Sequence, residues 1–508
     1  MPGIAQDCLR LPRISYNPKK TITIMIKRNL LLTALAIIAM TVRAGNTLTL
    51  TLSEAITLAQ EQSSEAKAAR HTFLAAEWNY KYYRANYLPT LTFSSSPSLN
   101  RVISKITLPD GTSSFVKQNQ LSTDATLSIT QNIALTGGQL FLNTSLQRQD
   151  EFENKTTAYN SQPVTIGYQQ SLFGYNSLKW DRRIEPLRYR EAKKRYNETM
   201  ELIASRTSSH FFSLASAQTE LEIAEYNYAS ADTLSRYARG RYDIGTITES
   251  EMLQLELNKL TEETNVLNAR TNLENVMQTV RSFLSLDNDV DIKVTVESDV
   301  PDVKFDLTEA LRLAHENSPD PDTYERNRRE SRSNLAYARA NSGLKADLYV
   351  QFGLSQTAGN LSDSYRSPQN QQYASIGITL PILDWGRGKG RVRVAQSNVD
   401  LVDTQVEQAL RDFDINVSKM VRQFNLQSYR VQVAEKTASL ARHRYDVARR
   451  LYILGKSTIL DFNAATSEKD SALRSHISAL QTYWSLYYGL RSMTGGDSNR
   501  GTLQLLRD

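Results

Sequence analysis

The chain has 508 residues and a formal net charge of +6. Residues 1–44 contain seven lysines and arginines against one aspartate, which accounts for the whole net charge. The remainder is formally neutral, so the basic isoelectric point does not indicate nucleic-acid binding. The only cysteine, Cys8, lies in the same leading segment. Without it the chain has no disulfide and no thiolate metal site.

The leading segment is predicted to be a leader with a signal peptide. After Met25, Lys27-Arg28 precede an apolar run over residues 30–40, and Val42-Arg43-Ala44 forms a small-x-small cleavage site. We expect translation to start at Met25 and the mature chain to begin near Gly45; the alternative is a buried core helix. No later stretch approaches ~18 consecutive apolar residues. An exported chain of this kind is periplasmic, secreted or an outer-membrane barrel.

The first helix after the leader has a copy in the second half of the chain. Thr51-Leu52-Ser53-Glu54 has the form of a capping box and is predicted to open a helix that runs to about Asn86. The matching stretch starts at Asp306-Leu307-Thr308-Glu309, at an offset of 255 residues, and the match persists to Asn341. The sequence therefore predicts two helices of equal length.

Beyond each helix the apolar period changes from 3.6 to 2. One face is apolar and the other carries Ser, Thr, Gln and Gly, which is the pattern of a membrane barrel with a wet interior and about ten residues per strand. A soluble β-sandwich shows a similar alternation, so this pattern alone leaves both folds open. The apolar positions are Leu127, Ile129, Ile133, Leu135, Val164, Ile166, Tyr168, Leu172, Leu348, Val350, Phe352, Leu354, Ile376, Ile378 and Leu380.

The segment from the end of the first helix to the end of the last strand is longer in the first half of the chain than in the second half. Strand ends at Leu172 and Ile382 lie at an offset of 210, so 45 additional residues stand between Asn86 and Leu172. This insertion is predicted to include a hairpin over residues 127–146 with Thr136-Gly137-Gly138 as its turn. Whether its strands join the barrel wall or project from it stays open.

Two long helical patterns then end at similar tips. Tyr242 to Glu251 and Tyr452 to Asp461 share an aromatic residue, a glycine and a carboxylate at an offset of 210. Roughly 65 helical residues precede each tip, which predicts rods of about 100 Å. Each glycine stands just after the long helix, where a left-handed glycine commonly ends a helix. The hydroxyl residues after it suit the N-cap of a shorter returning helix. Residues 494–508 have no periodicity and are expected to be disordered.

Catalytic and cofactor motifs are not found. Gly455-Lys456-Ser457 resembles the end of a phosphate-binding loop, but Arg450 occupies the place of the required first glycine. Gly386-x-Gly388-x-Gly390 resembles a dinucleotide loop, but Arg391 occupies the position of the third required glycine. This glycine-rich stretch suits a flexible joint between a strand and a helix. The histidines have no metal-ligand spacing. The sequence therefore favours a protein that is not an enzyme and needs no cofactor.

The order of these segments resembles the TolC-type outer-membrane efflux and secretion channels over nearly all of residues 45–496. The joint Tyr82-x-Arg84-Ala85-Asn86-Tyr87-Leu88-Pro89, the strand ends at Leu172-Phe173 and Leu380–Gly386, and the two tips carry the resemblance. It implies a mixed α/β membrane protein in the outer membrane of a Gram-negative bacterium, extending into the periplasm. The implied fold is a trimeric transmembrane β-barrel of about four strands per chain, continued by a long α-helical, coiled-coil barrel, with an internal two-fold repeat.

Residues argue for the homotrimer independently of the resemblance. Four strands from one chain would leave two open edges in lipid, whereas three chains close about twelve strands into one barrel. The resemblance implies passive conduction of exported small molecules or proteins, as the exit duct of a tripartite efflux pump or a type I secretion system. The implied partners are a periplasmic adaptor and an inner-membrane transporter, with no nucleic acid.

The resemblance also implies site residues. Tyr452 and Asp461 match constriction positions, although the second aspartate position is Ala464 and the arginine position after the glycine is Ser457. Three copies of Asp461 around an axis would raise each other's pKa and attract cations. The alternative for Asp461 is a solvated helix carboxylate. Adaptor docking is assigned to the tip residues Gly245, Thr246, Ile247, Gly455, Lys456 and Ser457.

The predicted division is a leader over residues 1–44, a first repeat over 45–300, a second repeat over 301–493 and a tail over 494–508. A rival function is a trimeric coiled-coil stalk or surface adhesin without a pore. That reading needs a sustained heptad and no barrel-like strands.

Overall fold

The computed structural model describes residues 47–107, 109–297, 300–301 and 303–495. The predicted leader and nearly all of the predicted tail lie outside these ranges. The chain divides into two compact units, and each unit takes residues from both halves of the sequence. Among the described residues, unit 1 holds 47–64, 206–301 and 430–482, and unit 2 holds 65–205, 302–429 and 483–495. Within the described ranges, no helix is both long and apolar enough to cross a membrane.

The helix predicted over residues 52–86 is two helices, α2 (Leu52–Gln62) and α3 (Ser64–Ala85). Ser63 takes an extended conformation at φ −60° and ψ 149°, and its N–H donates to the Ala59 carbonyl, which ends α2. The prediction of one unbroken helix was therefore wrong. The capping box was right, because the Thr51 side chain accepts from the Glu54 N–H and Glu54 accepts from the Thr51 N–H.

The same break occurs in the second half, between α6 (Leu307–Asn317) and α7 (Asp320–Ala340). Ser318 is extended there at φ −66° and ψ 146°. A proline follows Ser318, and the residue before a proline disfavours the helical conformation. No proline follows Ser63, so the first break has no comparable signal in the sequence.

The long helices have the predicted equal lengths. Both α4 (Ser177–Asp243) and α8 (Arg387–Ile453) have 67 residues, and both α5 (Glu249–Leu284) and α9 (Ile459–Thr494) have 36. The predicted tail boundary is one residue early, because α9 includes Thr494. A small parallel sheet of β1 (Thr47–Leu50) and β6 (Asp291–Val294) was not predicted. It packs on α4, where Gln218 bonds the backbone at Ile292 and Val294.

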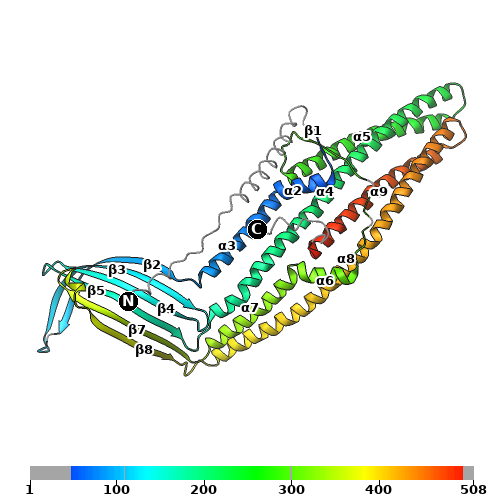
Figure 1. Ribbon diagram of the computed structural model, residues 1–508. Coiled ribbons are helices and arrows are strands. Elements are labelled where there is room, and N and C mark those ends of the chain that lie inside the picture. Colours follow the sequence, from blue (N-terminus) through cyan, green and yellow to red (C-terminus); the bar gives the residue numbers. More distant parts are fainter. Residues whose placement is uncertain (1–46, 108, 298–299, 302, 496–508) are drawn as a thin grey trace, which may run out of the picture. The chain divides into compact units, whose positions relative to one another are not determined.

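Unit 2 contains one antiparallel sheet of six strands in the order β2-β3-β4-β5-β7-β8 (Figure 1). The prediction of about four strands was too low, because the additional hairpin of the first half pairs within the sheet. Its predicted turn is present: Ile133 faces Gly138, and Gly137 has φ +78°. The strands are β2 (Thr90–Thr107), β3 (Ser113–Ile133), β4 (Gly138–Glu151), β5 (Thr156–Ser171), β7 (Lys345–Ala358) and β8 (Gln369–Thr379).

The register separates the sheet into an apolar and a polar face. Leu127 faces Thr144, and Ile129 faces Leu142, which in turn faces Ile166. The large apolar side chains of this face are exposed in the single chain, as expected for a surface that contacts lipid. They include Leu91, Phe93, Leu127, Ile129, Leu142, Ile166, Phe352, Ile376 and Ile378. The other face is crossed by polar contacts, such as Ser128 to Asn143 at 2.6 Å and Gln169 to Gln139 at 2.7 Å.

All four connections to the helices leave the sheet at the same end of its strands. The register aligns Thr90, Ser171, Lys345 and Thr379 at that end, next to the ends of α3, α4, α7 and α8. The β2–β3, β4–β5 and β7–β8 connections lie at the opposite end of the strands. The sheet therefore has a helical end and a free end.

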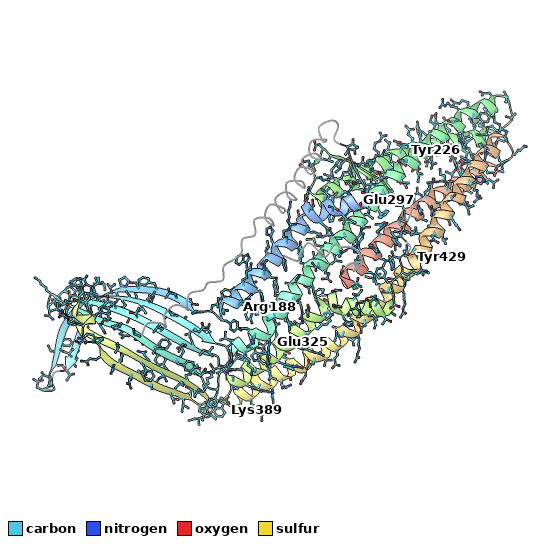
Figure 2. All side chains as sticks on the ribbon, in the orientation of Figure 1. Arg188, Tyr226, Glu297, Glu325, Lys389 and Tyr429 are labelled. Carbon is cyan, nitrogen blue, oxygen red and sulfur yellow. The ribbon has the colours of Figure 1, made fainter. Side chains whose placement is uncertain are left out.

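Charged side chains join α4 and α7 within unit 2. Asp322 of α7 is 6% exposed and contacts Arg190 at 2.5 Å and Lys194 at 2.8 Å, both on α4. Arg188 of α4 also contacts Glu330 of α7 at 2.7 Å. Figure 2 labels Arg188 and Glu325 on these two helices. Burial opposes ionisation of Asp322, but hydrogen bonds from the two cations prevail and lower its pKa.

Candidate functional site at the helical tips

The two tips end their long helices with the same backbone geometry. At the first tip the Gly245 N–H donates to the Tyr242 carbonyl at 2.8 Å, and the Thr246 N–H donates to the Arg241 carbonyl at 2.9 Å. At the second tip the Gly455 and Lys456 N–H groups donate to Tyr452 and Leu451 at 3.0 and 2.9 Å. This pair of bonds is the Schellman motif, which satisfies carbonyls that the helix end leaves free.

Both tip glycines are left-handed, with φ +74° at Gly245 and +72° at Gly455. Space does not require glycine at either position. No heavy atom lies within 4 Å of a Cβ placed at Gly245, and a Cβ at Gly455 meets only Arg241 Nη2 at 3.5 Å. The requirement at both tips is therefore conformational, because other residues avoid positive φ.

Each returning helix begins with a hydroxyl cap and a carboxylate. Thr248 and Glu251 form a capping box at α5. At α9, Asp461 Oδ2 accepts from the Thr458 hydroxyl at 2.8 Å and from the Ser457 hydroxyl at 3.3 Å, while Thr458 Oγ1 accepts from the Asp461 N–H at 3.2 Å. Asp461 is exposed, and its hydrogen bonds with Thr458 lower its pKa. In the single chain Asp461 therefore acts as a capping carboxylate.

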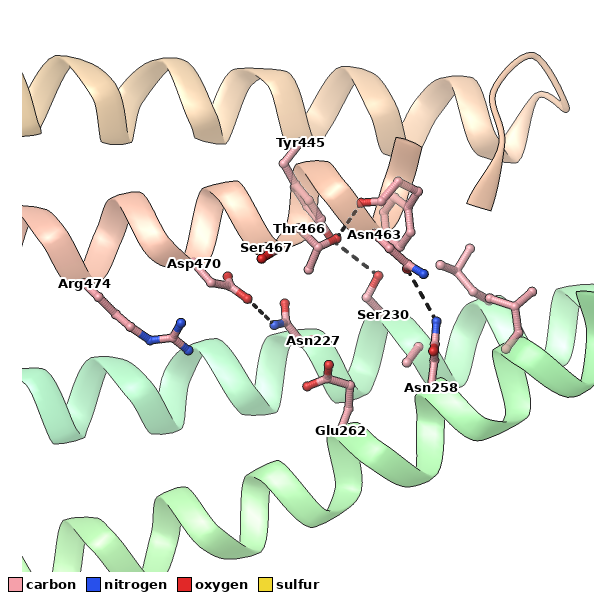
Figure 3. Close-up of a pocket in the computed structure, with 14 residues that line it drawn as sticks. Asn227, Ser230, Asn258, Glu262, Tyr445, Asn463, Thr466, Ser467, Asp470 and Arg474 are labelled. Carbon is pink, nitrogen blue, oxygen red and sulfur yellow. Dashed lines mark hydrogen bonds between the residues drawn. The ribbon is translucent and has the colours of Figure 1, made fainter. Parts of the chain in front are cut away.

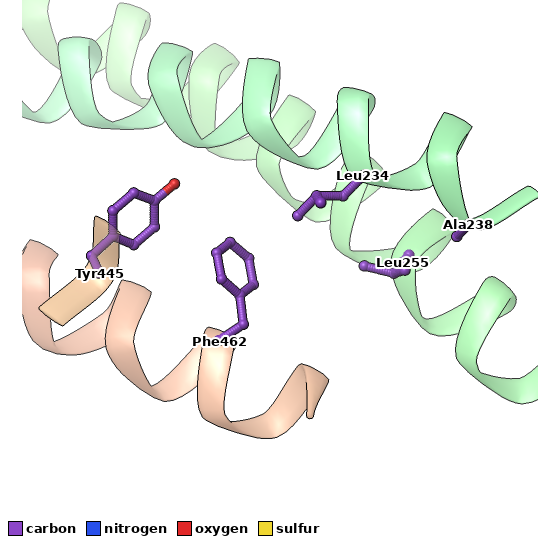
Figure 4. Close-up of a cluster of buried hydrophobic side chains, with 5 residues drawn as sticks. All are labelled: Leu234, Ala238, Leu255, Tyr445 and Phe462. Carbon is purple, nitrogen blue, oxygen red and sulfur yellow. The ribbon is translucent and has the colours of Figure 1, made fainter. Parts of the chain in front are cut away.

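The other predicted constriction residue, Tyr452, lies against a buried apolar cluster. Its ring stacks on Phe462 with centroids 5.7 Å apart. Phe462 belongs to a cluster that joins α4, α5, α8 and α9 (Figure 4). Ile247 of the first tip and Ile459 pack on the same cluster. Burial raises the pKa of Tyr452. The cluster consists of Leu234, Ala238, Leu255, Tyr445 and Phe462.

A polar cavity of about 300 Å³ adjoins this cluster in unit 1 (Figure 3). Asn227 of α4 donates to Asp470 of α9 at 2.8 Å across it, and Asn258 of α5 donates to Asn463 of α9 at 3.4 Å. Tyr445 lines the cavity, and burial raises its pKa to about 12. The cavity is thus framed by neutral amides, a buried carboxylate and a phenol that stays protonated at neutral pH.

A buried cation compensates the carboxylate. Lys469 is 6% exposed, and its Nζ lies 3.2 Å from Asp470 Oδ1 and 3.1 Å from Asn227 Oδ1. The same ammonium lies over the rings of Tyr445 and Tyr226, at 4.2 and 4.9 Å from their centroids. Aromatic faces attract cations, so the rings support a charge that would otherwise be poorly solvated. This cluster fixes α9 against α4 and α8.

The sequence interpretation did not find this polar cluster, although a signal exists. Asn227 lies between Ala224 and Ala231 at spacings of three and four, and all three are buried. Lys469 similarly continues the spacing of Ala465 and Ala472. A polar residue within an apolar helical stripe indicates a buried, partnered group. In the described part of the chain, no three His, Cys, Asp or Glu side chains could hold a metal ion.

Comparison with known proteins identifies the family. A model of the outer membrane efflux protein family matches residues 55–285 and 310–496. These ranges cover most of the chain, which therefore belongs to the outer membrane efflux protein family. No curated protein matches the chain.

Solved outer-membrane channels share the fold. The channel OprN matches with a TM-score of 0.62 at 16% identity, over 88% of this chain and 90% of that chain. VceC from Vibrio cholerae matches with 0.61 at 14% identity, over 88% and 96%. CmeC from Campylobacter jejuni matches with 0.62 at 17% identity, over 89% and 87%.

Family membership settles the broad class. The protein is an outer-membrane component of efflux that extends into the periplasm, and its family is one of transport proteins rather than enzymes. The rival reading as a stalk or adhesin without a pore receives no support from the comparisons. It also required that barrel-like strands be missing, whereas unit 2 contains a six-stranded sheet.

Proposed function

We propose that three copies of this chain form a continuous duct through the outer membrane. The observation that carries this proposal is the sheet of unit 2, whose edge strands β2 and β8 have no partner on their outer sides among the described residues. Open strand edges are not tolerated in lipid, so the edges of neighbouring copies would pair. Three sheets of six strands would close a barrel of about eighteen strands with its polar face inside.

The duct would continue as a barrel of helices built from two copies of one ancestral unit. The matching lengths of α4 and α8, and of α5 and α9, support this internal repeat. The repeated serine breaks at Ser63 and Ser318 support it further, since they lie at the same offset as the two helix starts. On this proposal the repeats cover residues 45–300 and 301–493.

Transport through the duct would be passive, with energy supplied by an inner-membrane transporter through a periplasmic adaptor. We assign adaptor docking to the tips, where Gly245, Thr246, Gly455 and Lys456 are exposed. Ile247 and Ser457 are half-buried and would contribute only their free surface. The cargo would be small molecules for an efflux pump or proteins for a type I secretion system.

The constriction would lie at the second tip, with Asp461 as a ring of three carboxylates and Tyr452 as its aromatic neighbour. The exposure of Asp461 supports this role. The hydrogen bond from the Thr458 hydroxyl stabilises the ionised form of Asp461, which a ring that attracts cations requires.

Export of a fluorescent substrate from whole cells tests the proposal directly. Cells that lack the gene should accumulate a fluorescent efflux substrate, and the intact gene should restore export only with a matching adaptor present. Restoration of export without any adaptor would contradict the docking role. Conductance by isolated monomers would contradict the closed barrel.

A further inference from the structure

The β2–β3 hairpin extends beyond the other strands at the free end of the sheet. β3 pairs with β4 from Gln120 onward, and the Phe152 N–H donates to the Asn119 carbonyl, whereas residues 113–118 pair with β2 alone. We call the two segments Arg101–Thr107 and Ser113–Asn119 the arm. Figure 1 shows the arm in light blue, turning away from the remaining strands. The 11 residues of β8 could not cover the 18 of β2, so edge pairing with a second copy would leave strand β2 partly bare.

The arm belongs to the cell-surface end of the sheet. The helices of unit 2 join the sheet at the opposite end of its strands, next to Thr90 and Thr379. Because the protein lies in the outer membrane and extends into the periplasm, the helical end faces inward. The free end with the arm therefore faces the outer leaflet.

One face of the arm combines cations with large apolar side chains. Facing residues of antiparallel strands place their side chains on the same side of the sheet. All three cations on this face are exposed, and the two apolar side chains, Ile103 and Phe115, are 62% and 72% exposed. The facing pairs are Arg101 with Asn119, Ile103 with Lys117, and Lys105 with Phe115.

This face continues the apolar face of the sheet. Going along β2 toward the helical end, the same side presents Leu99, Phe93 and Leu91, which are 64–69% exposed. No aspartate or glutamate lies on this side of β2 or β3. Asp150 of β4, which faces Leu121, is paired with Arg148 at 2.9 Å, and Asp110 in the β2–β3 turn accepts hydrogen bonds from Thr112. The apolar surface thus ends, on its outer side, in three cations that have no carboxylate beside them on the same side of β2 or β3.

We propose that the arm binds the phosphorylated headgroup of an anionic lipid in the outer leaflet. Arg101, Lys105 and Lys117 would contact phosphate oxygens, for which guanidinium and ammonium groups are the usual partners. Ile103 and Phe115 would lie against the upper acyl chains, as apolar residues do beside basic ones at a membrane surface. This contact would anchor the channel and set its depth in the membrane.

The test uses the purified full chain in a non-ionic detergent. The probe is bis-phosphorylated lipid A, compared with the same lipid after enzymatic removal of its phosphates. Each cation near an anionic surface contributes roughly a fivefold gain in affinity, so the variant R101Q/K105Q/K117Q should bind on the order of a hundredfold more weakly. The matched control is Arg366→Gln, which removes an exposed cation from the β7–β8 connection at the same end of the sheet.

The proposal predicts binding that needs phosphate, weakens with salt, is lost in the triple variant and persists in the control. Equal binding by the triple variant, or equal binding of the dephosphorylated lipid, would overturn it. A triple variant that changes the number of chains in the assembly would assign the arm to contact between copies and would also overturn it. Efflux measured in a separate assay tests the duct, since Arg101, Lys105 and Lys117 lie on the apolar side of the sheet and not on its polar side.

Discussion

Substitution of Gly455 separates the shape of the tip from its role in docking. The glycine has φ +72°, and the only atom that a Cβ would meet is Arg241 Nη2 at an ordinary 3.5 Å. A side chain therefore costs only the backbone strain of the left-handed region, about 1–2 kcal/mol. This cost is small for a chain that buries long helical interfaces, so Gly455→Val should fold and assemble.

Docking should be more sensitive, because an adaptor would meet the tip backbone closely and Gly455 is exposed. We expect Gly455→Val to keep the oligomer and the open-pore conductance near wild type, and to abolish export and adaptor crosslinking. Gly455→Asn tests the cause, since asparagine tolerates the left-handed region better than valine. Loss of export in both variants indicates that the adaptor excludes a Cβ, whereas rescue by asparagine indicates that backbone shape alone matters.

The matched control is Gly240→Val, at an open position inside α4 close to the first tip. Gly240 lacks positive φ, so this variant adds the same side chain without strain and should export normally. Export and crosslinking are measured in cells, and assembly is measured by size-exclusion chromatography. A Gly455→Val chain that fails to assemble would make the glycine a folding element, and one that exports normally would refute the tip assignment.

Further substitutions test the charged groups. Asp461→Asn keeps a cap acceptor but removes the charge, so single-channel recordings should show weaker cation preference; unchanged selectivity would leave Asp461 as a cap only. In the single chain, hydrogen bonds with Thr458 lower the pKa of Asp461, whereas neighbouring copies in a ring would raise it, so the pH at which wild-type cation preference is lost reports whether the ring forms. Asp322→Ala removes the buried carboxylate that holds Arg190 and Lys194, whose side chains are 57% and 19% exposed, and should lower the unfolding free energy by about 1–3 kcal/mol, against less than about 1 kcal/mol for the exposed Glu316→Ala. Because the folded-state pKa of Asp322 is lowered, its stabilisation is full above about pH 4 and is lost as the pH falls through that pKa, which acid titration of stability checks. Lys469→Met should cost about 3–5 kcal/mol by stranding Asp470, and the double variant with Asp470→Asn should recover part of it; no recovery in denaturation curves would contradict the pairing.

Internal matches made the helices predictable. The offset of 210 between the tips correctly gave the equal lengths of α4 and α8, because insertions rarely enter a packed helix. The break at Ser63 was not predictable, since no glycine or proline marks it and the helical period continues past it. Ser63 is fully buried in the structure, and burial of this kind is not visible in the local sequence.

The strands were predicted less completely. β2 contains the run Ser94-Ser95-Ser96, whose polar residues hide the alternation that marked β7 and β8. The contact of β1 with β6 joins residues about 240 positions apart through only four pairs, which no local pattern reveals. At the tips, the cap role of Asp461 could have been derived from its match with Glu251, since both stand three residues after a threonine.

The number of chains in the conducting particle tests the central claim most directly. The wild-type protein, purified in detergent, is measured for its protein mass by light scattering, and the same fraction is placed in planar lipid bilayers. The closed-barrel account predicts three chains per particle and conductance only from that fraction. A monomeric fraction that conducts ions would contradict it, because a single six-stranded sheet with two open edges could not then be the wall of the pore.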